Sequence, residues 1–394
     1  MEFDVVIIGG GLAGAGLAAA LAGDAQRVAL IERKVPPAPP ADWDLRVYTL
    51  TPASIAFLER FGVWQGVPRE RITPIYDMRV FGDDGVSRVD FSAYESGLPE
   101  LGATVEAGRL HHALWRGLER QRNLSLICPA VPSELRRDEN GIEIRLDLGR
   151  SVRAKLVVGA DGADSWVRQA AGMDARSDSY HQLGVVANFA CQRSHGNAAY
   201  QWFRRDGVLA FLPLPDRRVS IVWSAAQAHA RELLALPPAA FCARVREASR
   251  DALGELQLLG SAVAFPLGRL KSQRIAQDRV ALIGDSAHVV HPLAGQGINL
   301  GLGDAHCLAD LLRDAPNLGD RMLLRRFERS RAEDILALHW VTHGLLRLFG
   351  AGHPAIGRIR NLGLNLTNAN PVIKTLLARR ATAVGQGLRQ RETP

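Results

Sequence analysis

The chain has 394 residues, of which 47% are hydrophobic and 23% are charged, and its formal net charge is +7. This length is sufficient for one large domain or two interleaved domains with a substantial core, and the composition is that of a globular enzyme rather than a disordered chain. The positive charge comes without interleaved aromatic and basic residues, which argues against nucleic-acid binding. No run of 18 consecutive apolar residues occurs, so no segment is predicted to span a bilayer.

The N-terminus predicts a strand, a glycine-rich turn and a helix. The apolar run 4–8 is typical of a buried parallel strand, and Gly9, Gly11 and Gly14 follow it in the pattern G-x-G-x-x-G. In such a turn the first glycine permits a tight bend and the second lets the backbone approach a pyrophosphate. The third allows the helix to pack closely on the strand, and the helix N-terminus attracts the anion. The motif therefore indicates a dinucleotide-binding site.

A second strand is predicted at 27–31, and it ends at Glu32. A carboxylate at this distance from the glycines can accept hydrogen bonds from an adenosine ribose. We therefore expect Glu32 and the adjacent Arg33 to bind the adenosine end of the cofactor. The N-terminal motif alone leaves NAD, NADP and FAD open.

The segment 156–168 is another strand that runs into a glycine-rich turn. Asp161 and Gly162 lie at the predicted strand end, and Ser165 and Arg168 lie on the following helix. These residues could face the phosphates of a cofactor or a reducing nicotinamide. The alternative is a structural Asp-Gly turn, which is common.

A third motif lies some 270 residues after the first, where the strand 279–283 ends at Gly284 and Asp285. A carboxylate there can hydrogen-bond a ribityl hydroxyl. Closely spaced glycines then open a helix that continues through Asp304, so that backbone N–H groups can reach a ligand carbonyl. The predicted ligand-binding positions at this helix start are Gly295, Gln296, Gly297 and Asn299.

The distance between the first and third motifs separates two classes of enzyme. A simple NAD-dependent dehydrogenase has no need to return to its ligand so late in the chain. A flavoprotein must hold both ends of FAD, so the sequence favours FAD as the cofactor.

The order of the motifs predicts an α/β fold, with a Rossmann-like FAD-binding domain, an interleaved antiparallel β-sheet substrate domain and a C-terminal helical region. The segments between the motifs are rich in short alternating strands, which are suited to roof a substrate cavity. The predicted FAD-binding domain comprises 1–73, 92–176 and 266–330, the substrate domain comprises 74–91 and 177–265, and the helical region comprises 331–394.

These residues carry a resemblance to a known family. The chain resembles the flavin-dependent aromatic hydroxylases of the para-hydroxybenzoate hydroxylase fold, and among them most closely the ubiquinone-biosynthesis hydroxylases. The segments that carry it are 9–14 with Glu32, Arg46 within DLRVYTL, Asp161-Gly162, Gly284-Asp285 with HPLAGQGINLG, GVLAFLPLPD at 207–216 with SIVWS, and the tail 331–374. The family places the equivalent of Arg46 against the flavin, and the resemblance implies the same role here.

The resemblance implies an FAD-dependent monooxygenase that hydroxylates the aromatic ring of a polyprenylphenol, with O2 as co-substrate and a flavin C4a-hydroperoxide as oxidant. The reductant would be NAD(P)H or a protein electron donor. Because the flavin carries the chemistry, no single catalytic acid or base is expected. His291, Pro292 and Gly295 are expected at the active face of the flavin, and Phe211, Pro213 and Trp223 in the substrate roof.

Other functions stay open at this point. They are hydroxylation of another aromatic molecule, reduction of a prenyl double bond by an enzyme of the same fold, a non-catalytic flavin-binding scaffold and a plain NAD(P) dehydrogenase. The hydroxylated carbon, the electron donor and the oligomeric state are also left open by the sequence.

The C-terminal region suggests a partner. From Trp340 to the end there are eight Lys or Arg residues and one acidic residue, interspersed with Leu, Ile and Val. Such a segment can lie on an anionic membrane surface, contact other ubiquinone-pathway proteins, form a subunit interface or simply be a solvated face. The absence of a signal-like N-terminus and the four scattered cysteines predict a cytoplasmic protein without disulfides or a metal site. Peripheral contact with the inner membrane is the alternative that the basic C-terminal segment adds.

Overall fold

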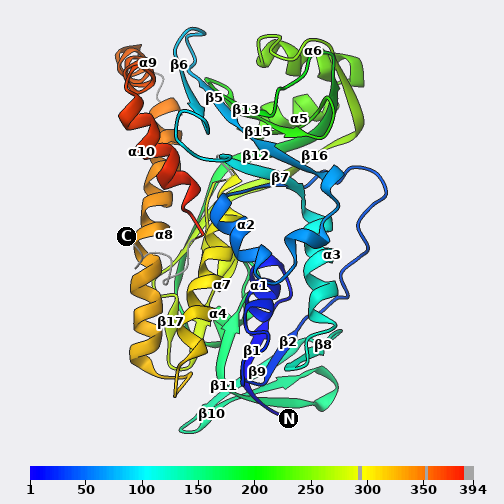
Figure 1. Cartoon of the computed structure of the whole chain (residues 1–394), viewed down its shortest axis with the longest axis vertical. Helices are drawn as coiled ribbons and strands as arrows, with labels where there is room; N and C mark the ends of the chain where they lie inside the picture. The colour runs from blue at the N-terminus through cyan, green and yellow to red at the C-terminus, as the bar shows by residue number, and fades with distance from the viewer. Residues whose placement is uncertain (292–294, 351–353, 386–394) are drawn as a thin grey trace.

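The computed structural model describes residues 1–291, 295–350 and 354–385, and it contains three β-sheets with helices packed around them (Figure 1). The sheets are built from segments that alternate along the chain. Their strands therefore interleave in sequence although each sheet is separate in space.

The first sheet has eight strands, and its centre is parallel. The central strand β1 pairs with β11 on one side and with β2 on the other, in parallel register. The strands are β1 (Glu2–Ile8), β2 (Val28–Ile31), β8 (Leu124–Ile127), β9 (Pro132–Asp138), β10 (Gly141–Leu146), β11 (Ser151–Gly159), β17 (Ala276–Gln277) and β18 (Val280–Leu282).

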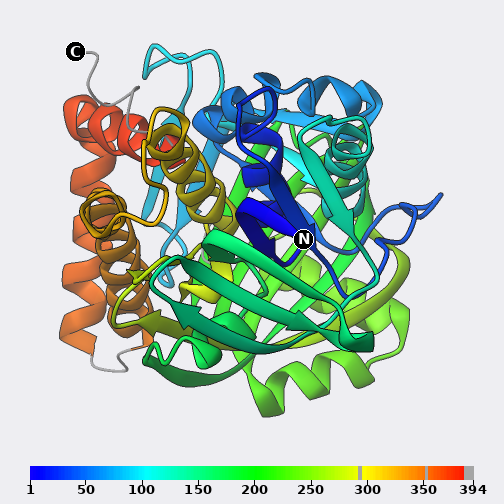
Figure 2. The same cartoon turned by 90° about the horizontal axis from the view of Figure 1, so that it is seen from below.

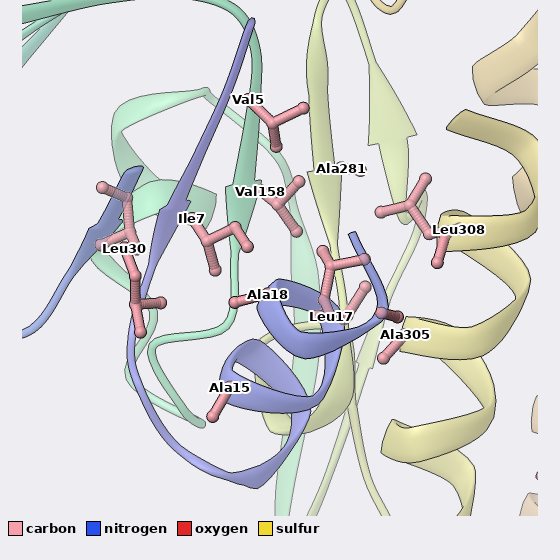
Figure 3. Close-up of a cluster of buried hydrophobic side chains, with 14 of the residues drawn as sticks. Val5, Ile7, Ala15, Leu17, Ala18, Leu30, Val158, Ala281, Ala305 and Leu308 are labelled. Atoms are coloured by element: carbon pink, nitrogen blue, oxygen red, sulfur yellow. The ribbon is translucent and has the colours of Figure 1, made fainter. Parts of the chain in front are cut away.

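Two helices pack on this parallel centre and enclose its hydrophobic core. They are α1 (Leu12–Ala20) and α7 (Gly297–Arg313), which contact each other although they are far apart in sequence. Figure 3 shows side chains of β1 and β11, such as Ile7 and Val158, directed towards Leu17 of α1 and Leu308 of α7. All four are fully buried. This packing places the N-termini of α1 and α7 at the same edge of the sheet.

The second sheet also has eight strands, mostly antiparallel, in the order β19-β16-β12-β15-β14-β13-β5-β6. Its strands are β5 (Asp77–Phe81), β6 (Arg88–Ser92), β12 (Ala175–Cys191), β13 (Ala198–Arg204), β14 (Gly207–Leu214), β15 (Arg218–Ala226), β16 (Leu256–Ser272) and β19 (His288–Val289). Helices α5 (Gln227–Ala235) and α6 (Pro238–Ala248) cover one face, where Phe241 packs on Phe189. Because side chains alternate along a strand, the residues between those covered by α5 and α6 point to the other face of the sheet.

A small third sheet and three further helices complete the part around the first sheet. The sheet has the order β3-β7-β4, from β3 (Val47–Leu50), β4 (Ile72–Ile75) and β7 (Gly102–Glu106). The helices are α2 (Pro52–Glu59), α3 (Ala107–Leu118) and α4 (Trp166–Ala170).

The C-terminal helices are α8 (Arg321–Gly350), α9 (Pro354–Ala369) and α10 (Pro371–Thr382), which gather along one side of the molecule (Figure 2). Three asparagines of α9 bind the β5–β6 hairpin at the edge of the second sheet. Asn361 Nδ2 donates to Asp83 at 3.0 Å, and Asn365 and Asn368 accept the backbone N–H groups of β6 at 3.3 and 3.0 Å. These bonds satisfy backbone donors that an edge strand would otherwise expose.

The predicted α/β class, with a Rossmann-like unit, an antiparallel sheet and C-terminal helices, is confirmed. The division into domains stays a prediction. Two of its boundaries, at 176/177 and 265/266, fall inside β12 and β16, because each of these strands is 17 residues long and continues across the predicted boundary.

Candidate functional site

The three glycines of the N-terminal motif have different environments. Gly9 has φ +104°, and a Cβ there would lie 2.3 Å from the carbonyl oxygen of Ala160. A Cβ on Gly14 would lie 2.0 Å from the carbonyl oxygen of Gly9, because α1 packs directly on the turn. By contrast, a Cβ on Gly11 would have no atom within 4 Å, and Gly11 lines a cavity. The fold therefore requires glycine at the first and third positions, whereas the second is open to a ligand.

The carboxylate at the end of β2 supports this turn. Glu32 Oε2 accepts the N–H of Gly10 at 2.7 Å, and Oε1 accepts the N–H of Lys34 at 3.1 Å. On the other side of Gly10, Trp115 Nε1 donates to its carbonyl oxygen at 2.8 Å, and His111 Nε2 lies 2.7 Å from the same atom. Nothing in the sequence pattern indicated these contacts of Trp115 and His111. The neighbouring Arg33 is exposed.

The cavity has a volume of about 1780 Å³ and extends from the glycine-rich turn to the C-terminal helices. One wall is formed by the N-termini of α1 and α7, and the opposite wall by the second sheet. Ligand pockets for one small molecule usually occupy about 300–1,000 Å³, so the cavity has room for a large cofactor and a second molecule.

Arg46 projects into the cavity from a loop that the surrounding structure fixes. Its guanidinium lies 5.3 Å from the centre of the Tyr48 ring. Asp44 Oδ1 accepts the N–H of Arg46 at 2.9 Å, and Oδ2 accepts the N–H of Gly108 at 2.9 Å. The buried Glu106 accepts the N–H of Asp44 at 2.8 Å, so the loop is tied to the start of α3.

Asp285 lies across the cavity from this loop, on the turn that follows β18. Asp285 lines the cavity and is exposed, whereas its neighbours Gly284 and Ser286 are buried. The enclosing protein atoms raise the pKa of Asp285, and the positive charges of His288 and Arg46 partly oppose this rise. A carboxylate in such a position favours a hydrogen-bond donor from a ligand, since the donor stabilises its charge.

A buried ionic network holds the turn of Asp285 in place. Asp304 Oδ2 accepts the N–H of Gly284 at 2.9 Å and lies 2.6 Å from His288 Nε2, while Oδ1 accepts Arg331 Nε at 2.7 Å. Burial alone would raise the pKa of Asp304, but the charges and hydrogen bonds of His288 and Arg331 lower it below its usual value. The network joins the turn to α7 and α8, and the sequence indicated Asp304 only as a helix residue.

The side chains of the Asp161 segment bond to other parts of the protein. Asp161 Oδ1 accepts the hydroxyls of Ser165 at 2.6 Å and Ser286 at 3.0 Å, and its other oxygen accepts a backbone N–H of α4. The guanidinium of Arg168 donates to the carbonyl oxygens of Ser286 and Ala163. These bonds hold the turn, and within it Gly162 lines the cavity. Contact of Asp161 with the cofactor stays a prediction.

The four residues predicted at the start of α7 have different surroundings. Gly295, Gln296 and Gly297 line the cavity. The carboxamide of Asn299 accepts the N–H of Thr51 at 2.9 Å and donates to the carbonyl oxygen of Thr49 at 2.9 Å. Asn299 is fully buried, and its side chain fastens α7 to β3. Contact of these four residues with the cofactor stays a prediction.

His291 is buried behind the cavity, and Pro292 lies outside the described residues. His291 Nε2 lies 3.2 Å from Gln182 Oε1, and the Tyr180 ring packs edge-on against the imidazole at 5.0 Å. Burial lowers the pKa of His291 to about 4, so its imidazole is neutral at physiological pH. His291 is not among the residues that line the cavity, and its position at the active face of the flavin stays a prediction.

The three predicted substrate-roof residues face away from the cavity. Phe211 and Trp223 are fully buried under α5 and α6 on the opposite face of the second sheet. Pro213 has the same parity on β14 as Phe211 and also does not line the cavity. The neighbouring alternate residues line it instead: Ala210 and Leu212 on β14, and Ser220 and Val222 on β15. The prediction identified the correct strands, but a one-residue shift changes the face of a strand.

The described ranges contain neither a cluster of metal-ligating side chains nor a membrane-spanning helix. No group of three or more His, Cys, Asp or Glu residues there could hold a metal ion. No helix in these ranges is long and apolar enough to cross a bilayer.

The glycine-lined turn, the second glycine-rich helix start facing the same cavity and the antiparallel roof define an FAD-dependent oxidoreductase. A sequence model of the family described as FAD binding domain matches residues 2–338. The chain is 35% identical over 381 residues to 3-demethoxyubiquinol 3-hydroxylase of Escherichia coli, which covers 94% of this chain and 96% of that protein. It is 36% identical over 383 residues to ubiquinone hydroxylase UbiL of Rhodospirillum rubrum, which covers 96% and 89%.

Among solved structures, PqsL of Pseudomonas aeruginosa in complex with 2-aminobenzoylacetate matches with a TM-score of 0.78 and 27% identity, over 92% of this chain and 99% of that chain. The chain thus belongs to the family of FAD-dependent ubiquinone-biosynthesis hydroxylases. It is an FAD-dependent monooxygenase.

Proposed function

We propose that this enzyme hydroxylates the aromatic ring of a polyprenylphenol intermediate in ubiquinone biosynthesis. The observation that carries this proposal is the shape of the cavity. It begins between Gly11, Asp285 and Gly295, continues along the apolar face of the second sheet, and ends among α8, α9 and α10. When the aromatic ring of such a substrate lies near the cofactor, its polyprenyl tail can extend along the apolar sheet towards the C-terminal helices. The names of the relatives support the same substrate class.

The cavity fits FAD by its donor groups and its open space. We propose that Gly11 and the N-terminus of α1 hold the pyrophosphate, and that Glu32 and Arg33 contact the adenosine end. Asp285 would accept a hydrogen bond from the ribityl chain. The backbone from Gly295 to Gly297 would contact the flavin ring, with Arg46 opposite.

Bound FAD would activate O2 for electrophilic transfer to the ring, with NAD(P)H or a protein electron donor as reductant. The residues of this chain then have three tasks. The N–H groups at the start of α7 stabilise negative charge on the cofactor, the second sheet orients the ring, and the enclosed apolar walls exclude water.

The function is tested in a strain that lacks this gene. We expect mass spectrometry of the quinone pool to show a polyprenylphenol that lacks one ring hydroxyl and its later methyl group. Complementation with the wild-type gene should restore the ubiquinone pool. An unchanged pool in the deleted strain would contradict the proposed substrate and favour another aromatic molecule.

We also propose that α9 and α10 contact the membrane surface peripherally. They expose Leu362 (58%), Leu366 (62%), Val372 (76%) and Leu376 (66%), and no acidic residue occurs between 340 and 385. Amphipathic helices with this pattern bind the interface through apolar burial, with attraction of basic residues to anionic lipids.

Vesicle flotation tests the membrane contact. With vesicles that contain anionic lipid, we expect the wild-type protein to float, and a variant with Leu362→Gln, Leu366→Gln and Leu376→Gln to remain in solution. Val35→Gln is the control, because Val35 is 69% exposed and lies in the loop between β2 and β3, outside the C-terminal helices. Equal flotation of the wild-type and triple variant would refute the contact. A change in sedimentation mass without a change in flotation would instead identify a subunit interface.

A further inference from the structure

The sheet wall of the cavity is almost entirely apolar. Its alternate residues include Val80, Phe91, Val186, Leu212, Val222 and Phe265. Within this wall, and among the described residues, the polar side chains directed into the cavity are Gln201 on β13 and Ser220 on β15. Tyr200 also borders the cavity, but its ring packs on the opposite face, where it stacks on Trp202 at 5.6 Å.

Both polar side chains are deeply buried and lack a protein partner. Gln201 is 5% exposed and Ser220 is 1% exposed. Within the described part of the chain, neither side chain has a protein hydrogen-bond partner, and neither is among the polar groups sealed inside the protein, so their polar atoms are open to the cavity that they line. A ligand that covers this wall would remove water from these groups, which costs about 1–3 kcal/mol for a group that the ligand does not hydrogen-bond.

A third polar group lies beside Ser220. Asn188 on β12 is directly opposite Ser220 in the antiparallel register, so the two side chains are neighbours on the same face. Asn188 Nδ2 donates to the carbonyl oxygen of Asp44 at 3.0 Å, while its Oδ1 is buried without a partner in the described ranges. Because Asp44 also fixes the loop of Arg46, this pair lies at the cofactor end of the cavity.

Gln201 lies farther from that end. In the register, Gln201 is opposite Ala210 of β14 and beside Val80 of β5, whereas Ser220 is opposite Leu212. Beyond Gln201 the wall becomes apolar, with Val80 and Phe203 packed towards Leu364 of α9. The polar side chains of the wall therefore lie towards the cofactor end of the cavity. Between Gln201 and α9, the described residues of the second sheet that line the cavity are apolar.

We propose that Gln201 and Ser220 are specificity-determining residues that bind the oxygen substituents of the aromatic ring. This inference rests on the proposed function. The Ser220 hydroxyl and the Gln201 carboxamide can each donate a hydrogen bond to a phenolic oxygen or accept one from it. Asn188 lies beside Ser220 but does not itself line the cavity. A site built to hydrogen-bond a hydroxyl rejects the analogue that lacks it, because its buried groups then stay unpaired. The same bonds fix the rotation of the ring beside the cofactor.

The test compares the binding of two ligands to the FAD-loaded protein: 2-geranylphenol and geranylbenzene, which differ by the hydroxyl. Binding is followed by the change in the visible spectrum of the flavin. We expect the wild-type protein to prefer the phenol at least tenfold. Ser220→Ala and Gln201→Met should each reduce this preference about three- to tenfold, through weaker binding of the phenol alone.

Both substitutions should leave folding intact, because each removes a buried polar group that has no protein partner. Ser224→Ala is the matched control. Ser224 lies on the same strand and the same face as Ser220 and is buried, but it does not line the cavity. We expect this control to keep the full preference and the wild-type FAD content.

The outcomes separate the inference from the function on which it rests. Equal affinity of the wild-type protein for both ligands, or an undiminished preference in both variants, would overturn the inference and leave the enzyme's substrate class standing. Binding of neither ligand by the wild-type protein would overturn the proposed function itself. A second readout is the fraction of reductant recovered as hydroxylated product rather than hydrogen peroxide, which we expect to fall in both variants.

Discussion

A Gly11→Asp variant should fold as stably as the wild-type protein and lose at least about a hundredfold in FAD affinity. Gly11 has φ −65° and ψ −177°, which any residue adopts, and its Cβ would meet no protein atom. Asp is a favoured residue at this position, the N-cap of α1, so the FAD-free protein should not be destabilised. Its charge would lie close to the pyrophosphate, where repulsion at about 5 Å costs about 3 kcal/mol in a medium of intermediate dielectric constant.

Two further variants make this prediction specific. Gly117→Asp adds the same charge at an exposed helical glycine with free space around it, and should leave FAD affinity unchanged. Gly14→Ala should instead reduce the stability of the FAD-free protein, because its Cβ would collide with the carbonyl of Gly9. Affinity is measured by titration of apoprotein with FAD, and stability by urea unfolding. Normal FAD binding by Gly11→Asp would exclude Gly11 from the pyrophosphate site.

The second large effect is expected at the buried network under the Asp285 turn. Asp304→Asn should lower the free energy of unfolding by about 3–5 kcal/mol, because it leaves the guanidinium of Arg331 buried with one carboxylate fewer. Arg331 and Asp304 are both fully buried. The variant should also bind FAD more weakly, since the N–H of Gly284 loses the acceptor that holds the turn.

The control is an exposed ion pair, Arg244 with Glu247 at 3.0 Å. Glu247→Gln should change stability by less than about 1 kcal/mol, because water and salt screen exposed charges. Urea unfolding of the FAD-free proteins measures both effects. A loss in Asp304→Asn no larger than that in Glu247→Gln would mean that the network contributes little to the fold.

The local motifs determined much of this protein from the sequence. Gly9, Gly11 and Gly14 predicted a strand, turn and helix, because only glycine tolerates the positive φ of the first position and the close packing of the third. The second glycine-rich helix start, at Gly295 and Gly297, predicted that the chain returns to the same ligand. Both signals are local in the chain, so sequence spacing alone carries them.

For other predicted residues the sequence indicated the segment, but only the structure shows which groups the side chain contacts. Asp161 and Asn299 lie beside the cavity-lining glycines, but their side chains bond to α4 and to β3. Phe211 and Trp223 lie on the strands of the roof, but on the face that α5 and α6 cover. A single sequence shows that side chains alternate along a strand, yet the choice of face depends on which element packs there.

Only the tertiary structure could reveal the groups that join distant segments. Asp304 and Arg331 form one network with Gly284 and His288, and Asn188 meets Ser220 and the loop of Asp44. These partners lie on different elements, and no periodicity connects them. The sequence by itself determined the class of cofactor and the fold, because backbone geometry at glycines is a local property. The tertiary structure decided which polar groups support the cofactor and which face the substrate, because hydrogen-bond partners and burial depend on how the elements pack.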